Sequence, residues 1–240
     1  MNRRLALLLC LMFPWLTTQA QTLPANFDAD FAVYVLGFNI GTIKQQMRCE
    51  HHNCTLTNDA SPPDWAKRFI NESSFETIEL QVEAQNLTWL SYHKALTRRY
   101  DDETKQINTH LLAEADRVYY PEKDLAWPKP AHVFDMVSLA YALQFYAQQS
   151  SNLPAFVLQD EQRQQALNFT TRAKHTQTHL NYKSDMNAQL YEWNTDDFDV
   201  KVWLIEELNL FPGRIEVLNK REDRRIRLSL EQPPRYNEQN

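Results

Sequence analysis

Two cysteines and two histidines near the start of the chain are the side chains best suited to chemistry. The segment reads Cys49-Glu50-His51-His52-Asn53-Cys54. Thiolates and imidazoles are ligands for zinc or copper. Two cysteines at the ends of a short loop can instead lie opposite each other on paired strands and form a disulfide. We favour the disulfide and predict no metal, because adjacent histidines in a tight loop point apart and an oxidising compartment competes for the thiols. The metal site remains the alternative.

Residues 1–20 have the pattern of a cleaved signal peptide. Arg3 and Arg4 precede an apolar run at 5–16, and Thr18 and Ala20 occupy the small positions that a signal peptidase reads. This run is too short to span a membrane, and no later segment reaches the ~20 apolar residues of a transmembrane helix. We therefore predict an exported, periplasmic protein whose residues 21–240 form a single β-rich domain without a transmembrane span.

The charge of the chain argues against a nucleic-acid partner. Loss of Arg3 and Arg4 with the leader changes the formal net charge from −6 to −8, whereas phosphate binding needs a basic surface. The C-terminal stretch 214–235 is locally basic, with acidic residues interleaved. We interpret it as the solvated face of an edge hairpin, and a site for anionic head groups or an acidic partner is the alternative.

The elements that must position these residues are strands. Residues 27–36 alternate apolar and polar, and Gly37 and Gly41 mark the turn into a returning strand on which Ile43, Gln45, Met47 and Cys49 share a face. Residues 63–71 are expected to make a helical turn, and 74–119 to form an antiparallel meander with a turn at 101–103. Residues 125–130 read as an irregular connector, and 154–230 as a second set of strands with turns at 211–213 and 220–223.

One convincing helix is predicted, at 135–147, with Asp135 as its N-cap. It is apolar on most sides, so we expect it to lie in the concavity of a curved sheet. The predicted fold is mainly β, a strongly curved antiparallel sheet or open barrel of about ten strands enclosing this one apolar α-helix. The residues that we expect to line a ligand cavity between helix and sheet are Met136, Val137, Ala140, Tyr141 and Phe145.

The sequence offers no catalytic constellation. Phosphate loops, dinucleotide fingerprints and the common hydrolase and metalloprotease motifs do not occur. Asp196, Asp197 and Asp199 lack the glycine and distal glutamate of an EF-hand, so we interpret them as a solvated turn. We predict a non-enzymatic protein without cofactors.

Four phrases in order resemble a known family. They are FAVYVLGFNIG (31–41), VFDMVSLAYAL (133–143), VWLIEELNLFPGRIEV (202–217) and IRLSL (226–230), and they resemble the bacterial exported family called domain of unknown function 3108. The resemblance implies a periplasmic curved sheet wrapped around a helix, similar to the LolA and LolB lipoprotein carriers. Where that family has an arginine closing the helix phrase, this chain has Gln144. No catalytic residues are implied.

The expected function is non-catalytic binding of a lipid or another amphipathic envelope ligand between helix and sheet. Aromatic residues make up 12% of the chain, and such side chains line apolar cavities. They also fill cores. The alternative is an envelope assembly or scaffold factor that acts through contacts with envelope proteins.

Overall fold

Seventeen β-strands and one α-helix occupy the described part of the chain. The computed structural model describes residues 26–62, 71–100, 103–150 and 152–237. The predicted signal peptide, the helical turn expected after Pro62 and most of the turn expected at 101–103 lie outside these residues. The strands before the helix are β1 (Phe27–Val35), β2 (Phe38–Glu50), β3 (Asn53–Ser61), β4 (Glu72–Glu83), β5 (Asn86–Arg99), β6 (Thr104–Ala113), β7 (Arg117–Tyr120), β8 (Leu125–Pro128) and β9 (Val133–Phe134).

The helix α1 spans Met136–Gln149 and is followed by eight strands. These are β10 (Val157–Gln159), β11 (Gln164–Ala166), β12 (Asn168–Thr178), β13 (Met186–Asn194), β14 (Phe198–Ile205), β15 (Phe211–Asn219), β16 (Arg224–Leu230) and β17 (Arg235–Tyr236). Short 3-10 turns lie at Pro121–Lys123 and Glu206–Leu208.

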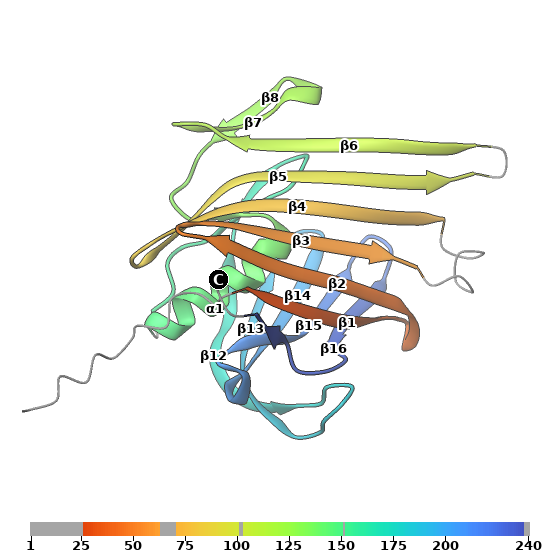
Figure 1. Ribbon diagram of the computed structural model, residues 1–240, viewed down its shortest axis with the longest axis vertical. Helices are drawn as coiled ribbons and strands as arrows, with labels where there is room; N and C mark the ends of the chain where they lie inside the picture. Colours follow the sequence, from red (N-terminus) through yellow and green to blue (C-terminus); the bar gives the residue numbers. More distant parts are fainter. Residues whose placement is uncertain (1–25, 63–70, 101–102, 151, 238–240) are drawn as a thin grey trace, which may run out of the picture.

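The first strand of the chain lies in the middle of the main sheet. The main sheet has fourteen strands: thirteen pair in the order β12-β13-β14-β15-β16-β1-β2-β3-β4-β5-β6-β7-β8, and β17 pairs with β1. Every pairing within this sheet is antiparallel. A second, three-stranded sheet has the order β11-β10-β9. Figure 1 shows the early strands β2–β6 crossing the later strands β13–β16 at a steep angle, with α1 beside both groups.

This architecture confirms the predicted mainly β fold with one apolar helix. Asp135 is the N-cap, since its side chain accepts hydrogen bonds from the backbone N–H groups of Val137 and Ser138. The ring of Tyr141 packs 5.2 Å from that of Phe27 and 5.8 Å from that of Phe211, measured between ring centroids. The buried apolar side chains of helix and sheet form one cluster.

Three local predictions are wrong. Residues 125–128 form the edge strand β8 instead of a connector, a place where Pro128 is tolerated because an edge strand leaves N–H groups unpaired. Residues 211–213 begin β15, and the turn precedes them, where Asn209 and Leu210 both have a φ of 56°. The β15–β16 hairpin is not at an edge, because β16 pairs with β1. The strand number exceeds the predicted ten because β7 to β11 are too short to show an alternation.

Candidate functional site

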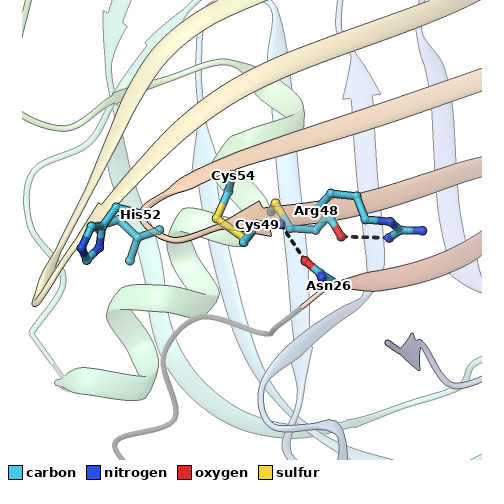
Figure 2. The surroundings of a disulfide bond; sticks show 7 residues. Asn26, Arg48, Cys49, His52 and Cys54 are labelled. Carbon is cyan, nitrogen blue, oxygen red and sulfur yellow. Dashed lines mark hydrogen bonds between the residues drawn. A yellow bond between two sulfur atoms is a disulfide. The ribbon is translucent and has the colours of Figure 1, made fainter. Parts of the chain in front are cut away.

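The structure confirms the disulfide between Cys49 and Cys54. The two residues are register partners on β2 and β3, with Cα atoms 4.0 Å apart. Figure 2 shows the bridge close to Asn26, whose Oδ1 accepts a hydrogen bond from the Cys49 backbone N–H at 2.6 Å. His51 and His52 form the turn between the strands and are exposed. The bridge uses both sulfur atoms, so this hairpin is a structural staple.

The five helix residues predicted to line a cavity lie in different surroundings. Ala140, Tyr141 and Phe145 are buried in the core, and Val137 is half-buried against it. Met136 lines a pocket, described below. No helix among the described residues is long and apolar enough to cross a membrane.

A row of polar side chains crosses the inner face of the early strands. Gln45, Asn58, Glu76, Lys94 and Thr109 are successive register partners on β2, β3, β4, β5 and β6. The neighbouring row toward the disulfide is mostly apolar and comprises Met47, Leu56, Ile78, Tyr92 and Leu111. Alternate residues of a strand share a face, so both rows face the concavity. Polar side chains in such a place are unusual unless they bond to one another.

Hydrogen bonds connect this row to the helix, and we call its members the polar row. Tyr141 donates its hydroxyl hydrogen to Gln45 Oε1 at 2.5 Å. Gln45 Nε2 donates to Asn58 Oδ1 at 2.8 Å, and Asn58 Nδ2 donates to Glu76 Oε2 at 2.6 Å. The other carboxylate oxygen of Glu76 accepts from the Tyr92 hydroxyl at 3.0 Å. The helix side chain and the four strands β2 to β5 are thus held in one network, which fixes their relative positions.

The polar row holds a carboxyl group in an apolar setting. Burial raises the pKa of Glu76, and the opposing effect of the Lys94 charge does not cancel it. Burial, together with the charge of Glu76, also raises the pKa of Tyr92. The Lys94 ammonium lies 3.9 Å from Glu76 Oε1, too far for a hydrogen bond. No hydrogen bond from this ammonium to another described residue is present, so its donors remain available.

A pocket of about 330 Å³ lies beside the polar row, at the end of the sheet away from the disulfide. Its walls include the apolar side chains of Val33, Ile43, Leu96 and Ile226, and Lys94 lines it as well. Ala60 and Ser74 contribute small side chains between Ile43 and Leu96 in the register. We call this space the mouth pocket. It combines apolar walls with one cationic group, Lys94, and one carboxylate, Glu72, which forms an ion pair with Arg98.

A second pocket of about 480 Å³ lies next to it. Val217 lines this pocket and is the register partner of Ile226 in the mouth pocket. Its remaining lining mixes Met136, Leu158 and Phe198 with the charged residues Asp160, Glu161, Arg163, Asp197, Arg221 and Glu222. Asp197 forms ion pairs with Arg163 and Arg221. Because the lining has four carboxylates against two guanidinium groups, this pocket suits an anionic ligand less than the mouth pocket does.

Other chemically suggestive groups do not assemble into a centre. Asp197 is buried and paired with arginines, and Lys220 lies 2.8 Å from Asp199. His110 contacts Glu122 at 2.6 Å, and its ring stacks on that of His93 at 4.2 Å between centroids. Within the described ranges no group of three or more histidine, cysteine, aspartate or glutamate residues could hold a metal ion.

The fold and the pockets define a class of protein, a β-barrel-like protein with a helix packed in its interior. A solved structure described as a beta-barrel-like protein of domain of unknown function DUF1849, from Brucella abortus, is similar, with a TM-score of 0.52 at 9% sequence identity. The similarity covers 90% of this chain and 99% of that one. At this identity the similarity concerns the fold alone.

The amino-acid sequence itself has no such match. No family profile matches the chain, so the resemblance to domain of unknown function 3108 is not supported by a family match. No curated protein matches it either.

Each member of the polar row can be recognised in the sequence, but the sequence does not show that these residues lie side by side. Gln45 falls between Ile43 and Met47 on an apolar face, and Lys94 falls between Tyr92 and Leu96. A polar residue at an inward position on each of several neighbouring strands is the signal that could have identified the row. It becomes a site only once the register is known.

Proposed function

We propose that this protein is a non-catalytic binder of an amphipathic anion, an acyl chain with one anionic group, in the cell envelope. The observation that carries the proposal is the Lys94 ammonium on the wall of the apolar mouth pocket. An acyl chain would lie against Val33, Ile43, Leu96 and Ile226, while its anionic group would accept hydrogen bonds from Lys94.

The dimensions and charges of the mouth pocket support a small ligand. Its volume of about 330 Å³ is near the lower end of the range of roughly 300 to 1,000 Å³ for small-molecule sites. The Lys94 side chain retains 32% of its exposure, against 10% for Glu76. Lys94 lines the mouth pocket and Glu76 does not, so Lys94 is the member of this pair that a ligand would reach. One cation suits one anionic group, which favours a single-chain ligand over a bulky lipid.

The proposed location differs from the space between helix and sheet. Tyr141 and Phe145 fill that space as core residues, and the polar row separates them from the mouth pocket. Placement in the envelope rests on the predicted signal peptide.

An assembly factor that offers an edge strand is the second candidate. Strand β12 has eleven residues and pairs only with β13 in the main sheet, so one edge is available for strand addition. However, its pairing is interrupted by two irregularities between Phe169 and Lys174, and it carries Arg172 and Lys174. Bulges and cations are features by which natural edge strands avoid pairing, so we rank this candidate second.

Native mass spectrometry of the protein purified from its own host tests the binding function. We expect adducts with masses of single-chain amphiphiles, which organic solvent removes. Delipidated protein should then bind a fluorescent fatty acid, and unlabelled fatty acid should displace the probe. Protein without adducts that also fails to bind the probe would contradict the proposal.

Two lysine variants locate the site. Lys94→Met should weaken binding of the fatty acid by about tenfold or more, because a charge-assisted hydrogen bond contributes roughly 1.5–3 kcal/mol. The same variant should bind the corresponding fatty alcohol as the wild type does. Lys44→Met is the matched control, since Lys44 is exposed on the outer face of β2 in the same sheet. Equal effects of the two variants would exclude the mouth pocket as the site.

A further inference from the structure

The tip of the β1–β2 hairpin exposes two large apolar side chains. Leu36 and Phe38 retain 68% and 76% of their exposure, the highest values among the large hydrophobic residues that the structure describes as exposed. A Cβ atom added to Gly37, between them, would meet no heavy atom within 4 Å. The tip therefore projects away from the rest of the described protein.

The backbone conformation at the tip is also unfavourable for the residue that occupies it. Leu36 has a φ of 50° and Gly37 a φ of 88°, so the hairpin turns through two left-handed residues. Such turns favour Asn-Gly or Asp-Gly, because a left-handed conformation is unfavourable for a bulky side chain. A leucine at this position is neither the residue that the turn favours nor one that packing requires. Local departures of this kind concentrate at functional sites.

The residues behind the tip are arranged as in a membrane interface. The Arg227 guanidinium on β16 lies 4.2 Å from the centroid of the Tyr34 ring on β1, which leads to the tip. The Leu36 backbone N–H donates to the Arg225 carbonyl at 3.4 Å, and the Arg225 side chain is exposed. With increasing distance from the tip, apolar side chains are followed by tyrosine and arginine. A protein that enters a bilayer has the same order, with apolar side chains in the hydrocarbon and tyrosine and arginine among the head groups.

We propose that the β1–β2 hairpin tip, Leu36 to Phe38, inserts into a lipid surface. A convex tip with two apolar side chains cannot bury the approximately 1,000 Å² that a stable protein interface needs, whereas insertion into a bilayer requires no matching surface. Ile40, two residues after Phe38, lines the mouth pocket, so insertion would hold that pocket close to the membrane. The proposal concerns a separate surface and stands whether or not the pocket binds a ligand.

Apolar insertion, not charge, should dominate the binding. The charges of the neighbouring turn are paired, with Lys220 contacting Asp199 and Arg224 contacting Glu222. Arg225 has no ion pair with a described residue, and the chain as a whole is acidic with a formal net charge of −6. We therefore expect the protein to bind zwitterionic vesicles and to respond little to salt.

Vesicle flotation tests the insertion. The probes are phosphatidylcholine vesicles, with and without one-quarter phosphatidylglycerol. The wild type should float with both kinds. The variant Leu36→Asn/Phe38→Thr should bind at least about tenfold more weakly, since each lost side chain removes a burial worth about a factor of ten. Asparagine suits the left-handed turn and threonine suits a strand, so the fold is retained, as circular dichroism can verify.

A matched variant and a second measurement make the outcome decisive. Leu112→Asn changes a leucine of β6 that is 40% exposed, and this variant should float as the wild type does. Equal flotation of the hairpin variant and the wild type, or no flotation of the wild type, would overturn the proposal. So would a dimer in sedimentation that the hairpin variant abolishes, because the tip would then bind a second copy.

Discussion

Replacing Asp135 with alanine tests whether the cap of α1 holds the helix within the sheet. The carboxylate accepts hydrogen bonds from the Val137 and Ser138 backbone N–H groups at 2.8 and 3.0 Å. It also accepts from Trp89 Nε1 at 2.9 Å and from the Ser138 hydroxyl at 2.5 Å. Trp89, Asp135 and Ser138 are all buried, so water cannot replace the lost acceptor. One side chain thus joins the helix to β5.

The magnitude follows from these contacts. Loss of the cap costs about 1 kcal/mol, and a buried indole N–H without an acceptor costs a further 1–3 kcal/mol, roughly. The Ser138 hydroxyl adds about 1 kcal/mol. Burial raises the pKa of Asp135, so removal of the carboxyl group also relieves an unfavourable desolvation, which offsets part of the loss. We expect Asp135→Ala to lower the free energy of unfolding by about 3 kcal/mol, a large share of a typical total.

The assay is urea unfolding followed by far-UV circular dichroism, with Asp135→Asn as the control. Asparagine caps helices as well as aspartate does, but its amide NH₂ cannot accept from Trp89. We therefore expect an intermediate loss, and adding Trp89→Phe to Asp135→Asn should cost less than the two separate losses combined. An alanine variant within about 1 kcal/mol of the wild type, or equal losses for alanine and asparagine, would refute the reasoning.

Two further predictions concern the polar row and the disulfide. Because burial raises the folded-state pKa of Glu76 above its usual 4.5, the unfolded chain ionises first as the pH rises, and stability falls until the folded-state pKa is passed. Glu76→Gln should remove this fall, so thermal unfolding from pH 4 to 8 should show the variant gaining relative to the wild type, and parallel curves would contradict it. Cys49→Ala/Cys54→Ala should lower the free energy of unfolding by at most about 2 kcal/mol, because the bridge closes a loop with a sequence separation of 5. Chemical denaturation measures this loss. Complete unfolding of the variant would contradict the prediction and would show that the fold depends on the disulfide.

Local signals in the sequence predicted the elements that depend on neighbouring residues. The N-cap at Asp135 and the apolar surface of α1 follow from a pattern within one segment, and so does the disulfide, whose cysteines sit at the ends of one hairpin. The alternation of β1 likewise showed Phe27, Ala29 and Phe31 on one face, and all three are buried.

Features that depend on register could not be read in this way. Alternation places Leu90 on the same face as Tyr92, yet the pairing shifts so that Glu79 faces Ser91 while Leu80 faces Trp89. The irregularity turns Trp89 into the core, where it reaches Asp135. A single extra residue exchanges the two faces of a strand, and nothing in the alternation marks its position. The pairing of β1 with β16 joins the two ends of the chain, which local patterns do not specify.

The mouth pocket exists because side-chain size changes along the concave face. In the apolar row beside the disulfide end, β3 and β4 contribute Leu56 and Ile78, which are fully buried against the core. At the mouth the same strands contribute Ala60 and Ser74. On these two strands space therefore opens beyond the polar row, at the mouth pocket. Since Tyr141 of the helix ends at Gln45 of that row, the polar row forms the boundary between a packed core and the mouth pocket. A ligand that enters the mouth pocket must meet Lys94 there, and this limits the proposed ligand to one whose anionic group can lie at that depth.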